Sequence, residues 1–143
     1  MDTQIRLQTD IREPFAGGMD FDDTGPYERL WGRVDFAVDP ETPAYQGVVD
    51  LEYAPRNSDG LVEFSTDFYI LKPVDLVRGN RRLIYEVNNR GTKLLLQFLN
   101  DAVRDKTPFN AEHAGNGFLM RRGYTIVWSG WQGNILPLDG RLT

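Results

Sequence analysis

A strand–helix–strand pattern between residues 82 and 134 constrains the fold of this chain more than any other feature. Residues 83–87 are mostly apolar, as in a strand covered on both faces, and residues 124–128 form a second run of this kind. Between them, apolar residues recur at spacings of three and four over residues 94–103, which predicts an amphipathic helix. Strand, helix and strand in this order are the building block of a parallel sheet. One such unit does not make a complete α/β enzyme, so we expect a small α+β domain or the front part of something larger.

The first half of the chain has a β pattern instead. Residues 61–71 and the second half of residues 27–38 alternate between apolar and polar side chains, as half-buried strands do, which predicts strands over 27–38 and 61–71. Residues 48–53 are predicted to form a further strand. A short strand is also expected at residues 5–7. The predicted fold class is therefore α+β or α/β, with an N-terminal antiparallel β layer that leads into the strand–helix–strand unit.

This change of pattern divides the chain into two predicted regions. Residues 1–80 form the β-rich region, and residues 81–143 form the strand–helix–strand region. The tail after residue 134 contains Pro137 and Gly140 and is compatible with the start of another β segment.

Composition excludes several classes of function. The net charge is -5 in 143 residues, which disfavours a nucleic-acid partner, since such proteins usually carry a basic stripe. The absence of cysteine excludes disulfides, cysteine-ligated zinc and cysteine nucleophiles. No apolar run approaches the length of a membrane span, and the first residues lack the pattern of a signal peptide. We expect a cytoplasmic location by default and no membrane partner; a secreted or periplasmic location is also compatible with the sequence.

Catalytic motifs are lacking. None of the three serines, Ser58, Ser65 and Ser129, lies in the G-x-S-x-G pattern of a nucleophile elbow, and His113 has no evident nucleophile as partner. No dinucleotide, phosphate-loop or calcium-loop pattern occurs, so no cofactor and no metal are expected.

Two loops follow the two predicted buried strands. Asn88, Asn89, Arg90 and Gly91 come after the first strand, and backbone N–H groups in such a turn can point at an oxyanion. The simpler interpretation is a tight connection that needs Asn and Gly for positive φ. In the second loop, Ser129 and Trp131, together with Trp128, either line a pocket or cap the core.

Several longer blocks resemble a known family. They are residues 25–30, 49–51, 54–57, 68–73, 85–91, 115–120, 123–124 and 127–133. In content and order they resemble the N-terminal part of a large bacterial family of alpha/beta hydrolase domain proteins, most of them uncharacterised. The resemblance extends from about residue 17 onward.

The resemblance implies that residues 81–143 begin an α/β-hydrolase core. In that case Asn88, Asn89, Arg90 and Gly91 would be the oxyanion loop, and the nucleophile, acid and histidine would lie beyond Thr143. The chain would be an N-terminal fragment of a carboxylic-ester hydrolase, inactive alone, whose partners are the remainder of the hydrolase and a small-molecule ester. The alternative is a self-contained, non-catalytic β-rich module that binds a glycan or a protein through aromatic residues. Trp31, Trp128, Trp131 and the tyrosines would then form its contact surface.

Overall fold

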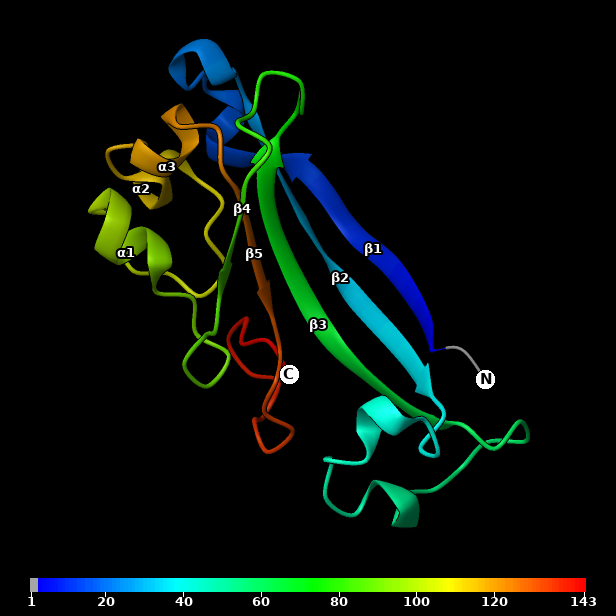
Figure 1. The fold of residues 1–143 in the computed structure, drawn as a ribbon. Helices are drawn as coiled ribbons and strands as arrows, with labels where there is room; N and C mark the ends of the chain where they lie inside the picture. The colour runs from blue at the N-terminus through cyan, green and yellow to red at the C-terminus, as the bar shows by residue number, and fades with distance from the viewer. Residues whose placement is uncertain (1–2) are drawn as a thin grey trace.

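The computed structural model describes residues 3–143 and is organised around one five-stranded sheet (Figure 1). The strands are β1 (Gln4–Pro14), β2 (Tyr27–Val38), β3 (Val62–Pro73), β4 (Leu83–Glu86) and β5 (Thr125–Ser129). They lie in the order β1-β2-β3-β5-β4. The pairings β1–β2, β2–β3 and β3–β5 are antiparallel, and only β4–β5 is parallel.

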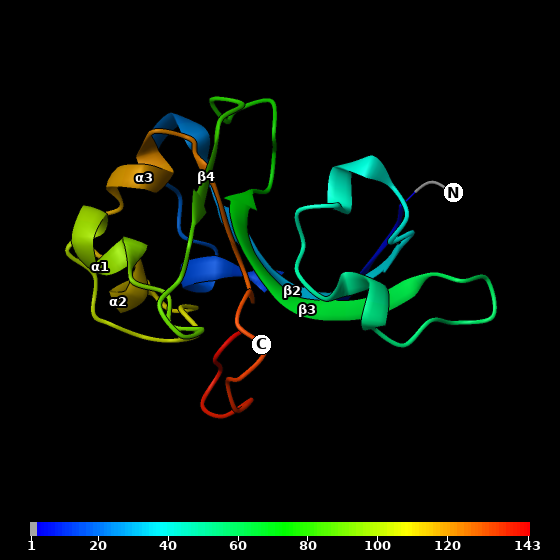
Figure 2. The same cartoon turned by 60° about the horizontal axis from the view of Figure 1, so that its bottom comes forward.

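Three short helices lie between β4 and β5 in the chain and pack beside that half of the sheet (Figures 1 and 2). They are α1 (Leu95–Asn100), α2 (Ala111–Ala114) and α3 (Phe118–Arg121). The 3-10 turns are η1 (Phe15–Gly18), η2 (Asp22–Thr24), η3 (Pro43–Tyr45) and η4 (Leu51–Tyr53). Figure 2 shows η3 and η4 at the far end of the bent β2–β3 ribbon, away from the three helices.

The core lies between the helices and the middle of the sheet. Tyr69 of β3 pairs with Trp128 of β5, both side chains are fully buried, and their rings meet edge to face at 5.9 Å. Tyr27 is also fully buried, and its hydroxyl donates to the carbonyl of Tyr124 at 2.9 Å. Burial of aromatic side chains of this size is the main stabilising contribution expected here, because each removes a large apolar area from water.

The long β1–β2 ribbon depends on one glycine. The register shifts between Thr9 and Ile11, opposite Gly32. A Cβ at Gly32 would lie 1.9 Å from the carbonyl oxygen of Gln8, so no other residue fits this close approach of two backbones. Irregularities of this kind generally bend a strand, and Figure 2 shows the sheet concave toward its far end, where η3 and η4 lie.

The predicted fold class is wrong. The sheet is mixed and mainly antiparallel, and the helices have only six, four and four residues, so a helix-rich α/β-hydrolase-like core is not present. The predicted helix over residues 94–103 ends at Asn100, because Asp101 adopts a left-handed conformation with φ 51°. Asn100 is fully buried and is held by bonds to α2 and α3, with its amide donating to the carbonyl of Ala114 at 3.0 Å.

The individual strands and helices agree better with the sequence predictions than the fold class does. The strands predicted at residues 27–38 and 61–71 are confirmed as β2 and β3, whereas residues 48–53 contain turns and η4 instead of a strand. The prediction that residues 83–87 are covered on both faces is wrong, since Leu83, Tyr85 and Val87 are exposed. β1 is much longer than the strand expected at residues 5–7.

The predicted regions 1–80 and 81–143 share one sheet, because β3 pairs with β5 across that boundary. Residues 1 and 2 of the first region lie outside the described part of the chain. None of the helices formed by residues 3–143 has the length and apolar character needed to cross a membrane.

Candidate functional site

Two loops meet at the carboxyl ends of the parallel strands β4 and β5. The side-chain amide of Asn88 donates to the carbonyl of Ser129, and the indole N–H of Trp131 donates to the carbonyl of Asn88 at 2.8 Å. The backbone N–H of Arg90 donates to the side-chain oxygen of Gln132 at 3.1 Å. The structure thus joins the two loops that sequence reasoning singled out, at the edge of the sheet where ligands of parallel strands usually bind.

The first loop is a tight two-residue turn. Thr92 N–H donates to the carbonyl of Asn89 at 3.0 Å, and the two residues between them, Arg90 and Gly91, have φ of 50° and 73°. Positive φ at both central positions is the geometry of a type I′ turn. The side chain of Asn88, which is almost fully buried, accepts from Gly91 N–H at 2.9 Å.

These bonds distinguish the Arg90 N–H from its neighbours in the turn. The N–H groups of Gly91 and Thr92 are bonded within the turn itself. That of Arg90 is bonded to a side chain that reaches across from the second loop, and Arg90 is exposed. A ligand oxygen could therefore replace Gln132 as its acceptor without disturbing the turn.

The second loop forms one wall of an apolar groove with a volume of about 350 Å³. The groove, called the aromatic groove below, is lined by Phe36, Phe64, Ser65, Thr66, Thr143 and residues 129–133. Phe36 and Phe64 are cross-strand partners whose rings stack at 4.9 Å with an interplanar angle of 13°. Trp131, another lining residue, is 56% exposed.

Of the three predicted pocket residues, Ser129 and Trp131 line the groove and Trp128 does not. Trp128 is fully buried, and its indole N–H donates to the carboxylate of Glu86. The sequence pattern did not identify Phe36 and Phe64 as residues of the groove. Their contact follows from the β2–β3 register, which pairs Phe36 with Phe64, 28 positions further along the chain. Alternation alone gives the faces of a strand but not its partner residues.

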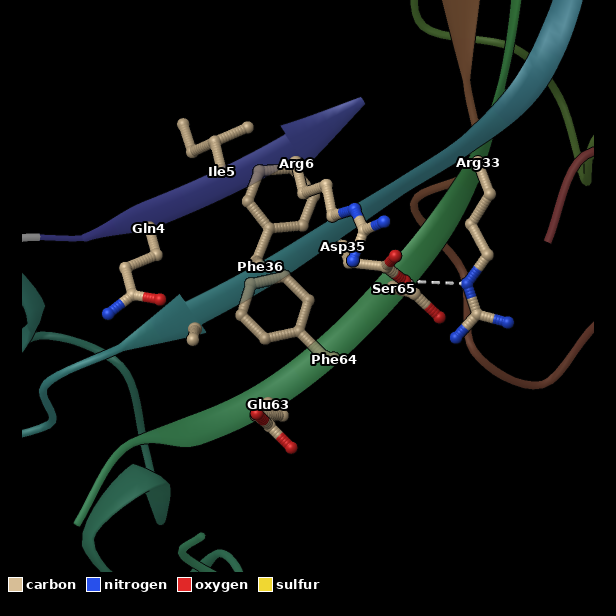
Figure 3. A pocket seen from close by; sticks show the side chains of 10 residues that line it. Gln4, Ile5, Arg6, Arg33, Asp35, Phe36, Glu63, Phe64 and Ser65 are labelled. Carbon is tan, nitrogen blue, oxygen red and sulfur yellow. Dashed lines mark hydrogen bonds and ion pairs between the residues drawn. The ribbon is translucent and has the colours of Figure 1, made fainter. Parts of the chain in front are cut away.

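A larger and more polar hollow of about 650 Å³ adjoins the aromatic groove at the concave end of the sheet (Figure 3). Its charged lining residues are Arg6, Arg33, Asp35 and Glu63. Arg33 donates to Asp35 at 2.7 Å, and both side chains are largely solvated. This exposed ion pair neutralises itself and contributes little to stability. None of the residues predicted from the two loops lies in this hollow.

The serines and the histidine do not form a catalytic pair. Ser129 Oγ lies 2.8 Å from the hydroxyl of Tyr85. Nδ1 of the buried His113 accepts from the backbone N–H groups of Phe109 and Asn110, and its Nε2 lies 3.5 Å from Asp105. His113 thus caps a loop and a helix. Within residues 3–143 no cluster of three or more His, Asp or Glu side chains could hold a metal ion.

A half-buried carboxylate, that of Glu86, and a buried ammonium, that of Lys93, lie next to the two loops and hydrogen-bond to the backbone there. Glu86 accepts from the N–H groups of Leu94 and Leu95 at 2.9 and 3.0 Å, so it satisfies the first donors of α1. Lys93 donates to the carbonyls of Lys106 and Gly140, and its ammonium lies 4.6 Å from the centre of the Tyr69 ring. Burial lowers the pKa of Lys93 to about 8, against the opposing attraction of the nearby carboxylates, first among them Asp105.

Comparisons of the chain with protein-family models, with curated proteins and with solved structures found no match.

Proposed function

We propose that this chain forms the substrate-binding part of a carboxylic-ester hydrolase and does not hydrolyse esters alone. The substrate would be a small-molecule ester. The nucleophile, the acid and the catalytic histidine would belong to the remainder of the hydrolase, which we propose as the chain's partner.

The observation that carries this proposal is the double role of Gln132. Its side-chain oxygen accepts from the Arg90 N–H at 3.1 Å, and the same residue lines the aromatic groove. A carbonyl oxygen of an ester is the same type of acceptor as the amide oxygen of Gln132. An ester that enters the groove can therefore take over this bond, and its carbonyl would then point at a fixed backbone donor. One donor of this kind contributes about 3 kcal/mol to transition-state stabilisation in acyl-transfer enzymes.

The aromatic groove suits the rest of such a substrate. Its volume of about 350 Å³ fits a small acyl or aryl group, and its floor contains the stacked rings of Phe36 and Phe64. Flat apolar groups gain both burial and ring contacts on such a surface. An aryl ester is therefore the ligand to test first.

The test combines binding with activity. Isothermal titration of the purified chain with methyl benzoate should show saturable binding, and Phe64→Ala should weaken it about tenfold, because the variant removes one ring of the stack. Phe98→Ala is the matched control, since Phe98 is exposed on α1 and lines no part of the groove. None of the three proteins (wild type, Phe64→Ala and Phe98→Ala) should hydrolyse p-nitrophenyl butyrate. Turnover that a serine-directed fluorophosphonate abolishes would contradict the proposal, as would equal binding by wild type and Phe64→Ala.

A second candidate is a non-catalytic module that uses the same groove to bind a glycan. It is favoured by the absence of a serine–histidine contact in residues 3–143 and by the Phe36–Phe64 platform. Three of the nine tryptophans and tyrosines expected to contact a partner are unsuitable, because Trp128, Tyr27 and Tyr69 are fully buried. Tighter binding of an oligosaccharide than of methyl benzoate would favour this candidate over the ester-binding proposal.

A further inference from the structure

A separate hollow lies where β4 begins, at the opposite end of this strand from the Asn88–Gly91 loop. Its volume is about 300 Å³, and it shares no lining residue with the aromatic groove or with the larger polar hollow. Its lining includes Pro73, Leu76, Arg81, Arg82, Leu83 and Thr125. It is called the arginine hollow below.

The walls of the arginine hollow are apolar and open to solvent. In the β4–β5 register Leu83 pairs with Thr125, and Ile84 pairs with Ile126. Ile126 is fully buried in the core, and successive residues of a strand point to opposite faces of the sheet. Leu83 and Thr125 therefore point away from the core. Leu83 is 60% exposed and Leu76 is 55% exposed, so a ligand can reach both side chains.

Hydrogen bonds fix the backbone that carries the two arginines. Asn80 N–H donates to the carbonyl of Gly123 at 3.0 Å, and Thr125 N–H donates to the carbonyl of Arg82 at 3.0 Å. The side-chain oxygen of Asn80 also accepts from Arg82 N–H at 2.8 Å. These bonds lie on both sides of Arg81, so the rim of the hollow is formed before any ligand arrives, which lowers the cost of binding.

Both charged residues that line the arginine hollow are positive. Arg81 and Arg82 are exposed, and neither side chain forms an ion pair or a hydrogen bond within residues 3–143. The carboxylate of Asp75, in the same loop, accepts from Val77 N–H at 2.9 Å and does not line the hollow. In a chain with a net charge of -5, an apolar hollow thus carries two positive charges with no acidic partner among its lining residues.

We propose that the arginine hollow binds a small amphiphile with an apolar chain and an anionic head group, either a carboxylate or a phosphate. A guanidinium presents N–H donors in a planar fork that matches the oxygens of both head groups. The apolar chain gains burial against Leu76 and Leu83. This inference goes beyond the proposed function and does not depend on it, because the two sites share no lining residue.

Two probes with chains of equal length test the role of the charge. The chain, labelled with ¹⁵N, is titrated with octanoate and with the neutral octanamide, and amide chemical shifts are followed. We expect saturable shifts at Gly123 and Thr125, with octanoate bound about tenfold more tightly than octanamide and with a preference that falls as salt is added. Octyl phosphate then assigns the head group, since the tighter binder of the two anions identifies it.

Variants separate the two halves of the site. The double variant Arg81→Met, Arg82→Met should bind octanoate no more tightly than octanamide and should keep the wild-type affinity for octanamide. Arg104→Met is the matched control, because Arg104 is exposed, forms no ion pair within residues 3–143 and lies outside the arginine hollow. Leu76→Asn should weaken both probes severalfold. Unchanged amide shifts in β2 and β3 show that each variant is folded.

Three results would overturn the proposal. They are equal affinity of the wild type for octanoate and octanamide, an intact preference in the folded double variant, and shifts confined to residues outside the hollow. None of them bears on the ester proposal, which is tested with methyl benzoate at the aromatic groove. Conversely, failure of methyl benzoate to bind would leave the octanoate result standing.

Discussion

Replacing Lys93 by methionine should flatten the dependence of stability on pH between pH 7.5 and 10. The Lys93 ammonium is buried against the ring of Tyr69 and donates hydrogen bonds to the carbonyls of Lys106 and Gly140. Burial lowers its pKa from 10.5 to about 8. Between these two values the unfolded chain binds a proton that the folded chain has lost. The free energy of unfolding therefore rises with pH across this window, because stability increases wherever the unfolded state binds more protons.

The size of the effect follows from the two pKa values. A difference of 2.5 pKa units corresponds to about 3 kcal/mol over the whole window, of which about 2 kcal/mol falls between pH 7.5 and 10. Two tyrosines oppose the rise at higher pH. Burial raises the pKa of Tyr69 to about 12 and raises that of Tyr27 as well, so above pH 10 the unfolded state loses its tyrosine protons first and stability falls.

The assay is urea unfolding at pH 7.5, 8.5, 9.5 and 10 for the wild type, Lys93→Met and Lys106→Met. The tyrosine contribution is common to all three proteins and cancels in differences between them. The stability of the wild type relative to Lys93→Met should increase by about 2 kcal/mol from pH 7.5 to 10. Lys106, which pairs with the exposed Asp139, is the control, and its variant should follow the wild type. If the difference in the free energy of unfolding between wild type and Lys93→Met stayed constant within about 0.5 kcal/mol over this pH range, the lowered pKa of Lys93 would be refuted.

Two further substitutions test how the loops are held in place. Glu86→Ala removes the acceptor for the N–H groups of Leu94, Leu95 and Trp128. We expect the free energy of urea unfolding to fall by about 2–4 kcal/mol, and to fall less in Glu86→Gln. Equal stability of the wild type and both variants would contradict the capping role. Gly91→Ala would place a Cβ 2.6 Å from the carbonyl oxygen of Leu142 at a φ of 73°, so we expect faster hydrogen exchange at Leu142 N–H and a lower melting temperature. Gly133→Ala, whose Cβ meets no atom within 4 Å, should leave both unchanged, and a similar response of the two variants would argue against close packing at Gly91.

The sequence predicts those parts of the fold that depend on local pattern. The pattern over residues 27–38, which alternates in its second half and ends before Asp39 and Pro40, predicts β2, since the period of a half-buried strand is visible in the sequence itself. The turn residues of the Asn88–Gly91 loop likewise predict a turn there, although positive φ occurs at Arg90 and Gly91 and not at the asparagines.

Long-range contacts account for what the sequence does not predict. The apolar spacing over residues 94–103 is that of a helix, yet Asn100 ends α1 because its side chain and carbonyl are needed by α2 and α3. Likewise, Glu86 acts as a cap for residues eight and nine positions later, and the Phe36–Phe64 stack depends on register. The predicted α/β-hydrolase-like core required longer helices than these contacts allow.

The central claim is that an ester carbonyl replaces Gln132 as the acceptor for the Arg90 N–H while its apolar group occupies the aromatic groove. The most direct measurement is a titration of the chain, labelled with ¹⁵N, with methyl benzoate, followed by amide and indole chemical shifts. We expect the Arg90 amide and the Trp131 indole to shift together, with a single dissociation constant, and Phe64→Ala to weaken both responses. Shifts confined to other parts of the sheet, or an Arg90 amide that does not respond while Trp131 does, would contradict the claim.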